Sequence, residues 1–541
     1  MTFCHLANNS ASTSPYINRT HNPKTMKTYF CFFVLILALA ACHPNYTGND
    51  YMRSVNEAME PPQQDQGEFN TEEYDRIYEN PFLDVLQNPQ STFAIDVDGA
   101  SYTNTRRFLN EGNMPPKDAV RIEEFVNYFT YDYPDPTGEH PFATYTEVAD
   151  CPWNTDHKLL HVGIQGKRLN TEELPNNNLV FLLDVSGSMD YPNKLPLLKS
   201  AFQLLIDQLD ENDRIAIVVY AGAAGQVLPS TTGDQKETIL AAINNLGAGG
   251  STAGAAGIQL AYQIAEEHFM EDGNNRIILA TDGDFNVGTS SDAELTRLIE
   301  EKRETGIYLS VLGFGTGNYK DSKMEKIANN GNGNFYYIDQ ILEAKKVLVN
   351  EMGGTLLTIA KDVKIQLEFN PAKVAQYRLI GYENRLLRNE DFADDTKDAG
   401  ELGAGHSVTA LYEIVPRDPG EEITSSTKYA YQTTSIAPEA YASKDMATLR
   451  FRYKPPQDST SKLIEQTILD EQMPLNNAST DFRFAAAVAE FGLLLRDSEH
   501  KKDASFEQVV ALGKDAQGKD EQGYRASFLE LVNQARTLVK D

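Results

Sequence analysis

The chain is 541 residues long, 41% hydrophobic and 10% aromatic, and it carries a formal net charge of -30. Because this length exceeds one ordinary domain, we expect about two to four domains with hydrophobic cores. The acidic balance argues against nucleic acid as a partner, since phosphates would be repelled. It is typical of a soluble, self-repelling surface or of one that attracts cations.

The N-terminus has the pattern of an export signal. Lys24 and Lys27 precede the apolar run "YFCFFVLILALAA" at 29–41. This run is too short to span a bilayer comfortably and suits the core of a signal peptide. We therefore expect a signal peptide over residues 1–41, with Met26 as the better start.

The end of this apolar run, "LAAC" at 39–42, resembles the lipobox of bacterial lipoproteins. The resemblance implies cleavage before Cys42 and a diacylglycerol anchor on its thiol. An ordinary secreted protein or an uncleaved anchor is the alternative. The mature chain would keep only Cys42 and Cys151, so an acylated Cys42 leaves no intramolecular disulfide and stability must come from packing.

The first part of the mature chain divides into a tether and a mixed region. Residues 42–78 are polar and rich in Asn, Gln, Glu and Pro, which predicts a disordered tether. Residues 79–174 predict an N-terminal α+β region. Its expected strands lie at 92–98, 141–153 and 158–169, and its expected helices at 101–112 and 115–129.

From residue 175 to 355 apolar strands alternate with amphipathic helices. Near-continuous Val, Ile and Leu strands separated by helices indicate an α/β fold with a doubly wound, mostly parallel sheet covered on both faces. The expected strands are 177–184, 213–222, 275–284, 307–315 and 334–339. The expected helices are 194–209, 234–246, 252–269, 291–306, 319–330 and 341–352.

After this region the helical rhythm stops and later returns. Residues 356–460 predict a β-rich domain, because four segments alternate like strands of an antiparallel sheet or sandwich. These segments are 360–370, 374–384, 403–416 and 446–456. Residues 461–541 predict a C-terminal helical region, where apolar side chains share helical faces. The two faces are Phe484, Val488, Phe491, Leu495 and Phe528, Leu531, Ala535, Leu538.

Oxygen-bearing side chains follow three segments of the doubly wound region. They are Asp184, Ser186 and Ser188 in "LLDVSGSMD", Thr252 in "GAGGSTAG", and Asp282 in "ILATDGDFN". Ligands of such sheets bind at the carboxyl ends of the strands, so we expect these groups to meet. Carboxylates and hydroxyls suit Mg²⁺ first, with Ca²⁺ or Mn²⁺ as alternatives. Two carboxylates and three neutral hydroxyls leave a sixth position of the ion, at which a partner's carboxylate could bind as a further ligand.

Here residues 175–355 resemble the von Willebrand factor type A domain, called the A-domain below. The D-x-S-x-S at 184–188, the Thr at position 252 and the D-G at 282–283 resemble the three segments of its metal-ion-dependent adhesion site. The resemblance implies that Ser186, Ser188 and Thr252 bind the ion directly, while the two aspartates bind it directly or through water. A degenerate domain that kept these residues as helix caps is the alternative.

The flanks resemble a bacterial family of envelope proteins with a central A-domain and an uncharacterised C-terminal domain. The segments that carry this resemblance are "NPQSTFAIDVDGASYTNTRRFL", "PPKDAVRIEEFVNYFTYDYP", "GYENRLL" and "GAGHSVTALYEI". The strand-like residues 141–170 and 360–455 lie on either side of the A-domain. If they pair in one sandwich, the A-domain is an insertion in it.

The other motifs of the sequence do not predict an enzyme. His157 and His161 form H-x3-H, but on a strand they lie apart, and we expect surface or cross-strand positions. The "GHSVT" at 405–409 ends in Thr where a nucleophile elbow needs Gly. Asp96 and Asp98 in "DVDGAS" have no matching second and third segments, so we treat them as turn residues. A one-metal phosphatase is the best enzyme alternative, and we expect no enzyme activity.

The sequence thus predicts a lipid-anchored protein of the bacterial cell envelope, on the outer membrane or a periplasmic face. It would bind an envelope or extracellular protein, or a glycan, whose acidic group completes the coordination of a divalent cation. The alternative is a structural or assembly subunit of an envelope complex, in which the metal stabilises the fold.

Overall fold

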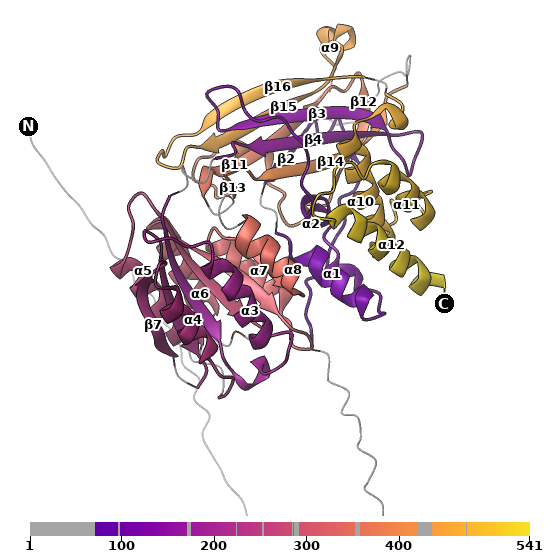
Figure 1. The fold of residues 1–541 in the computed structure, drawn as a ribbon. Helices are drawn as coiled ribbons and strands as arrows, with labels where there is room; N and C mark the ends of the chain where they lie inside the picture. The colour runs from indigo at the N-terminus through magenta and orange to yellow at the C-terminus, as the bar shows by residue number, and fades with distance from the viewer. Residues whose placement is uncertain are drawn as a thin grey trace, which may run out of the picture. The chain divides into compact units, whose positions relative to one another are not determined.

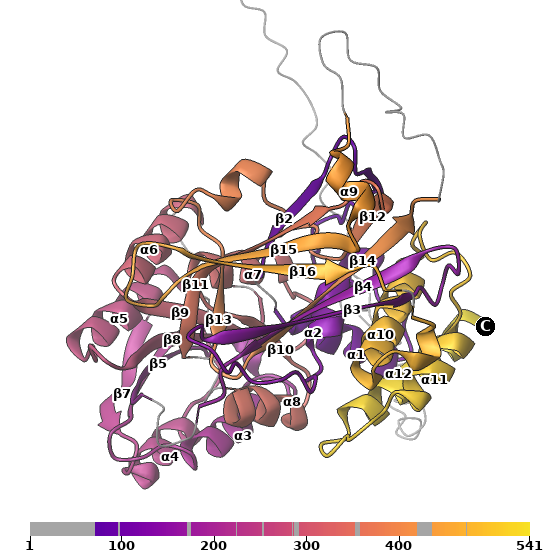
Figure 2. The same ribbon diagram turned by 90° about the horizontal axis from the view of Figure 1, so that it is seen from above.

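The described residues form an A-domain, a sandwich of two antiparallel sheets and a group of C-terminal helices (Figures 1 and 2). This confirms the expected fold class. The computed structural model describes residues 71–540 except 96–97, 170–174, 223, 251–253, 284, 286–291, 352–356, 419–434 and 472. The predicted signal peptide, Cys42 and Thr252 lie outside the described residues. Within the described ranges no helix is long and apolar enough to cross a membrane.

The A-domain is built on a six-stranded sheet in the order β10-β9-β8-β5-β6-β7. All neighbouring strands are parallel except β6 and β7, which are antiparallel. The strands are β5 (Asn177–Asp184), β6 (Arg214–Tyr220), β7 (Ala224–Thr232), β8 (Asn274–Thr281), β9 (Ile307–Phe314) and β10 (Phe335–Ile338). The chain runs from β5 to β6 on one side and later enters β8 on the other, so the switch point lies between β5 and β8.

Helices cover both faces of this sheet because each carries an apolar stripe. On α3, for example, Leu198, Phe202 and Leu205 are buried against the sheet. One face packs against α3 (Leu195–Ile206), α4 (Lys236–Asn244) and α8 (Ile341–Lys345), which continues as the π-helix η4 (Lys346–Glu351). The other packs against α5 (Gly254–Glu267), α6 (Asp292–Glu304) and α7 (Asp321–Asn330).

The two sheets of the sandwich combine strands from before and after the A-domain. One sheet has the order β1-β12-β14-β4-β3, and the other has β13-β11-β15-β16 with β2 paired to β11. The early strands are β1 (Leu83–Asp84), β2 (Gln90–Ala94), β3 (Phe142–Asp150) and β4 (Lys158–Gly166). The later strands are β11 (Thr358–Phe369), β12 (Val374–Ile380), β13 (Gly400–Gly403), β14 (Ser407–Pro416), β15 (Asp445–Lys454) and β16 (Lys462–Leu469).

The pairing of β4 with β14 confirms that the A-domain is an insertion in the sandwich. Val162 on β4 lies opposite Ala410 on β14 in an antiparallel ladder. The backbone N–H of Gly405 donates to the carbonyl of Lys167 at 2.9 Å, and that of Ala404 donates to the carbonyl of Leu357 at 2.8 Å. The chain therefore leaves the sandwich and returns to it at neighbouring positions.

A helical layer packs on the sandwich at the C-terminus. It holds α10 (Thr480–Arg496), α11 (Phe506–Asp515) and α12 (Tyr524–Lys540), which share a core with α1 (Ala100–Asn110) and α2 (Ile122–Asn127). Phe528 contacts both Phe484 and Phe491 edge to face in this core. Short helices elsewhere are η1 (Lys117–Ala119), η3 (Gly187–Met189), η5 (Asn389–Phe392), α9 (Pro438–Ala442) and η6 (Leu475–Asn477).

Three expectations from the sequence were wrong in detail. Residues 462–469, expected in the helical region, form β16 at the edge of the sandwich. The helix expected at 115–129 is interrupted, because Val120 and Arg121 are extended between η1 and α2. Strand β7 was not predicted.

The end of the expected tether is also ordered. The backbone N–H of Thr71 donates to the carbonyl of Gly317 at 2.8 Å, and Glu73 pairs with Lys320 in a parallel bridge. The Glu72 carboxylate forms a 2.9 Å ion pair with Arg107 of α1, and both side chains are buried. Residues 71–73 therefore lie along the loop that follows β9, so the tether prediction was wrong for them.

Candidate metal site

Four of the five predicted ligands lie at one edge of the A-domain sheet, which we call the metal edge. Asp184 ends β5, Asp282 follows β8, and these two strands flank the switch point. The Ser186 backbone N–H donates to Asp184 Oδ1 at 2.8 Å, and the hydroxyls of Ser186 and Ser188 lie 3.0 Å apart. The hydroxyl of Thr281 lies 3.5 Å from Asp184 Oδ2 and links the two strand ends. Thr252 is outside the described residues.

Backbone contacts hold the loop that carries the two serines. The N–H of Val185 donates to the carbonyl of Tyr220 at the end of β6, at 3.1 Å. The N–H of Gly187 donates to the carbonyl of Gly250 at 3.2 Å, and that of Gly249 donates to the carbonyl of Val185 at 2.7 Å. The D-x-S-x-S loop is therefore fixed against the loop that leads to position 252.

The backbone geometry at position 283 explains why a glycine follows Asp282. Its φ is +99°, in the region that disfavours other residues, and a Cβ at this position would lie 2.5 Å from the backbone nitrogen of Lys320. The Gly283 N–H also donates to the Thr281 hydroxyl at 3.2 Å. Only a residue without a side chain lets this strand end pass so close to the loop after β9.

The two aspartates of the metal edge have different electrostatic surroundings. Both are fully buried. Burial raises the pKa of Asp184 to about 6, and the nearby charge of Asp282 adds to this rise. Burial also acts to raise the pKa of Asp282, but the ammonium of Lys194 and hydrogen bonds outweigh it, so its pKa is lowered.

The donor set suits a hard divalent cation. Two buried carboxylates and two hydroxyl groups converge, and oxygen ligands of this kind match Mg²⁺, Mn²⁺ or Ca²⁺. A cation would also neutralise the carboxylate of Asp184, whose charge is costly in a buried position. Within the described residues there is no cluster of three or more His, Cys, Asp or Glu side chains that could hold a metal. The metal edge depends instead on hydroxyl oxygens.

Lys194 is a further charged residue at the metal edge that sequence reasoning missed. Its Nζ lies 3.0 Å from Asp282 Oδ2 and 3.4 Å from Asn318 Oδ1. In the sequence it stands just before a helix in "YPNKLPLL", where a lysine reads as an exposed residue. No local pattern could have shown that it turns inward.

The histidines of the H-x3-H motif have separate roles. The Nδ1 of His157 lies 2.6 Å from Glu413 Oε1 across the sheet. His161 is fully buried, and its Nε2 lies 2.7 Å from the Tyr133 hydroxyl. His161 therefore has the predicted cross-strand position, opposite Leu411 of β14, and not the surface position that was the other expectation. It belongs to the core between β4 and the C-terminal helices.

The interpretation of Asp98 as a turn residue was incomplete. It is buried, its Oδ1 accepts from the backbone N–H of Phe335 at 2.7 Å, and its Oδ2 pairs with Arg385 at 3.2 Å. It therefore joins β10 of the A-domain to the sandwich. Asp96 lies outside the described residues.

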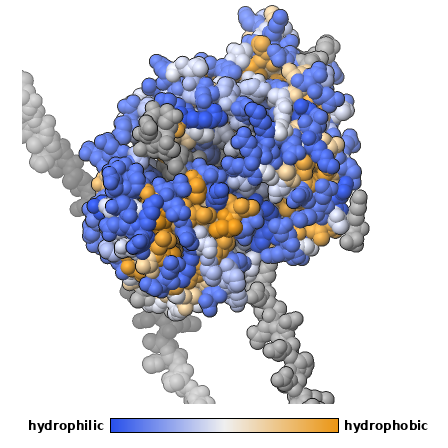
Figure 3. Space-filling model, viewed as in Figure 1, coloured by the Kyte–Doolittle hydropathy of each residue, from blue (hydrophilic) through white to orange (hydrophobic). Residues whose placement is uncertain are grey.

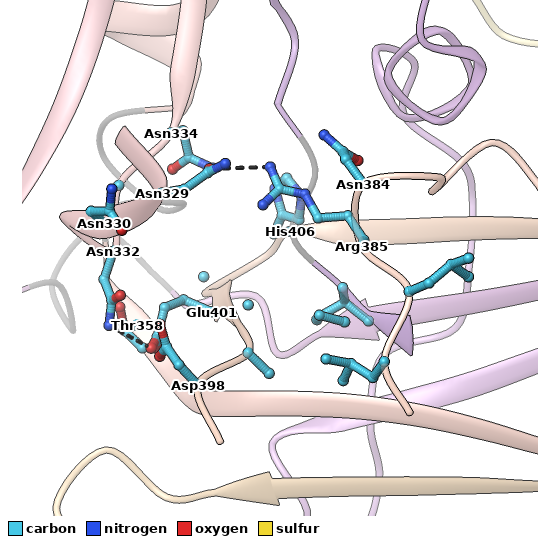
Figure 4. A pocket seen from close by; sticks show the side chains of 18 of the residues that line it. Asn329, Asn330, Asn332, Asn334, Thr358, Asn384, Arg385, Asp398, Glu401 and His406 are labelled. Carbon is cyan, nitrogen blue, oxygen red and sulfur yellow. Dashed lines mark hydrogen bonds between the residues drawn. The ribbon is translucent and has the colours of Figure 1, made fainter. Parts of the chain in front are cut away.

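A cavity of about 240 Å³ lies between the A-domain and the sandwich, away from the metal edge (Figure 4). Its lining is polar, and many of its side chains bond one another. Asn332 donates to Glu401 Oε1 at 3.0 Å, and Arg385 donates to Asn329 Oδ1 at 3.1 Å. None of the predicted ligands lines this cavity, and we interpret it as part of the interface between the two domains.

Apolar side chains gather on the A-domain surface over α8 (Figure 3). Leu342 is 62% exposed, and its neighbour Ile341 is also exposed. Helix α8 follows β10, a strand parallel to β9, so the helix begins at the edge of the sheet where the carboxyl ends of the parallel strands lie, which is also the metal edge.

The comparisons with known proteins agree with this description. The family model described as von Willebrand factor type A domain matches residues 178–349. A model described as von Willebrand factor matches 68–161, and one described as uncharacterized protein YfbK, C-terminal, matches 354–538. Fold and matches together define a protein with a von Willebrand factor type A domain. Such domains commonly bind a divalent metal and mediate protein interactions.

The relatives define the family further. The uncharacterized protein YfbK of Escherichia coli (strain K12) is 46% identical over 472 residues, which are 86% of this chain and 81% of that protein. The chain therefore belongs to the YfbK family. The uncharacterized protein sll0103 of Synechocystis is 30% identical over 190 residues, which are 35% of this chain and 44% of that protein. A solved von Willebrand factor type A structure from Catenulispora acidiphila is 16% identical and covers 74% of this chain and 92% of its own, with a TM-score of 0.38.

Proposed function

We propose that this protein binds a protein or glycan ligand through a divalent cation held at the metal edge. Asp184, Ser186, Ser188 and Asp282 would hold the ion together with Thr252. The observation that supports this most is the convergence of two buried carboxylates and two hydroxyls at the switch point of a doubly wound sheet. Mg²⁺ is the first expectation, with Ca²⁺ or Mn²⁺ as alternatives.

The ligand would offer an acidic group. The two carboxylates and three hydroxyls of the set would leave a sixth position of the ion open, and an acidic group of the ligand would fill it. In this proposal the role is binding rather than catalysis, and Ser186 and Ser188, whose hydroxyls lie 3.0 Å apart, serve as ligands of the ion.

We also propose that the protein is anchored in the bacterial envelope by a lipid on Cys42. The lipobox-like "LAAC" at 39–42 supports this. Replacing Cys42 by serine should move the protein from the membrane fraction to the soluble fraction and remove the acyl mass from its N-terminal peptide. Cys31→Ser is the matched control, because Cys31 would leave with the signal peptide. Equal membrane association of the Cys42→Ser protein and the wild type would contradict the anchor.

A pull-down from envelope extract tests the proposed binding. The soluble chain from residue 43 serves as bait, in Mn²⁺ and in EDTA, as wild type, Asp184→Ala and Asp190→Ala. Asp190 is an exposed aspartate in the same loop, so its variant changes the charge equally without touching the predicted ligands. A partner retained by wild type and Asp190→Ala in Mn²⁺, and lost in EDTA and in Asp184→Ala, is expected. Partners that ignore both metal and mutation would favour a structural or assembly role instead.

A further inference from the structure

Lys194 places a resident positive charge beside the metal edge. It is only 5% exposed, and its Nζ lies 3.0 Å from Asp282 Oδ2. Asn318 Oδ1, from the loop after β9, is its second partner at 3.4 Å. A buried ammonium is costly unless it is paired, so this contact defines where the charge stays.

The surroundings hold the lysine side chain in place. Gly315 has a φ of +74°, and a Cβ at this position would overlap the Cε of Lys194. The lysine stem therefore lies directly against the backbone of the loop after β9. On another side the ring centroid of Tyr191 lies 5.5 Å from Nζ, and this tyrosine is 52% exposed. These contacts place the lysine stem against the loop after β9 and its ammonium between Asp282 and the ring of Tyr191.

The charged side chains described at the metal edge determine the net charge of the site. Asp184 and Asp282 contribute two negative charges, and Lys194 offsets one of them. A divalent cation bound there would leave a net charge of about +1, whereas the same site without the lysine would be neutral. The lysine repels the metal and attracts an anion, and both effects are strong because the groups are buried.

We propose that Lys194 couples metal binding to anion binding at the metal edge. It lowers the affinity of the site for the metal alone and raises the affinity of the loaded site for a carboxylate ligand. Because coupling is reciprocal, the carboxylate in turn tightens the metal. The site is then filled firmly only when ion and acidic ligand are present together. This inference rests on the proposed metal-dependent binding.

Replacing Lys194 by methionine separates the two effects. Mn²⁺ affinity is measured by isothermal titration of the soluble chain from residue 43. Acetate affinity of the Mn²⁺-loaded protein is measured by the loss of water-proton relaxation enhancement. Lys194→Met should bind Mn²⁺ about tenfold more tightly and acetate several-fold more weakly than wild type, because the charge acts with opposite sign on the two. Lys345→Met, which removes an exposed lysine of α8, should match wild type in both.

The opposite directions distinguish this role from a structural one. A lysine that only supports the loop would, when removed, weaken Mn²⁺ and acetate together, and that result would overturn the inference. Unchanged affinities in Lys194→Met would overturn it too, while leaving the proposed function intact. Absence of Mn²⁺ binding in wild type and all variants would overturn the proposed function and this inference with it. If Lys194→Met does not fold, Lys194→Gln keeps a hydrogen-bond donor and is expected to show the same opposite changes.

Discussion

At the scale of single residues, burial determines how charged groups behave in this chain. At the metal edge burial raises the pKa of Asp184, whereas for Asp282 the ammonium of Lys194 and hydrogen bonds outweigh burial and the pKa falls. In the C-terminal helices Glu490 is fully buried, and its Oε1 accepts from the backbone N–H of Ser505 at 3.1 Å. Burial raises the pKa of Glu490 to about 8.

Glu490 should make stability depend on pH. Its pKa rises from an ordinary value of 4.5 to about 8 in the fold, so between these values the unfolded chain loses a proton that the folded chain keeps. The free energy of unfolding should therefore fall as pH rises through this window, by an amount on the order of a few kcal/mol. Glu490→Gln should make this fall smaller than in the wild type, and urea unfolding at pH 5 and pH 8 measures it. Glu530→Gln, at an exposed site of α12, should keep the wild-type pH dependence; the same dependence in Glu490→Gln would contradict this account.

Gly283 is the residue at which the backbone of the metal edge is most constrained. Gly283→Ala should lower the free energy of unfolding by about 2–4 kcal/mol, because a Cβ meets the loop after β9 at a positive φ. Gly225→Ala in β7 is the matched control, since a Cβ there meets nothing within 4 Å. Equal urea midpoints for the two variants would show that the loop after β9 moves aside for the added methyl group without a cost in stability.

Sequence alone could predict that Asp184 and Asp282 lie close together at the metal edge, but not that Lys194 pairs with Asp282. Asp184 and Asp282 end parallel strands that lie side by side, so topology brings them together. Lys194 and Glu72 could not be predicted, because their burial depends on loops that arrive from distant parts of the chain. The full burial of His161 could not be predicted for the same reason, since the C-terminal helices cover it.

At the scale of elements, ion pairs attach the A-domain to its surroundings. Arg106 of α1 reaches Asp339 after β10 with two hydrogen bonds at 2.6 and 2.8 Å, and Glu343 of α8 at 2.9 Å. The hydroxyl of Tyr128 also donates to Glu343, at 2.7 Å. These groups are buried, so α1 and α8 are held together by a network that would be costly to break.

Removing the arginine of this network should be strongly destabilising. Arg106→Met leaves two buried carboxylates without their cation, and we expect a loss of about 3–5 kcal/mol in the free energy of unfolding. Lys117→Met removes an exposed pair with Asp497 and should change stability little. Urea denaturation followed by tyrosine fluorescence measures both. A loss in Arg106→Met as small as in the control would mean that water replaces the guanidinium.

Apolar patterning predicted the strands that are almost wholly buried and failed for the exposed edge strands. The strands β5, β8 and β9 are almost wholly buried, and their apolar runs were recognised. Strand β16 is mostly exposed at the sandwich edge, and β7 is an edge strand that contains Pro229, so neither shows a clear alternation. The break at Arg121 follows from its buried ion pair with Asp321 at 2.5 Å, a tertiary contact that overrides helix propensity.

At the scale of the whole molecule, the A-domain is an insertion tied to its host at several points. The backbone hydrogen bonds of residues 404 and 405 are one such point. The others are the ion pairs of Asp321 with Arg121 and of Asp339 with Arg106, and the hydrogen bond from the backbone N–H of Phe335 in β10 to Asp98. Residues 71–73 add a contact to the loop after β9, which also carries Asn318 beside Lys194. Domains joined in this way should unfold together.

Calorimetry can test whether the inserted domain and its host unfold as one. The wild-type chain from residue 43 should show one endothermic transition, because unfolding either part exposes the buried ion pairs between them. The double variant Arg106→Met, Arg121→Met should broaden or split this transition. Two separate transitions in the wild type would show that the interface contributes little to cooperativity.

The central claim, a divalent cation at the metal edge, is tested most directly by titrating Mn²⁺ calorimetrically into the wild type, Asp184→Ala and Asp190→Ala. We predict about one ion per chain for wild type and Asp190→Ala, no measurable binding for Asp184→Ala, and similar melting temperatures for all three in EDTA. Mn²⁺ binding by Asp184→Ala with wild-type affinity, or no binding by the wild type, would contradict the claim.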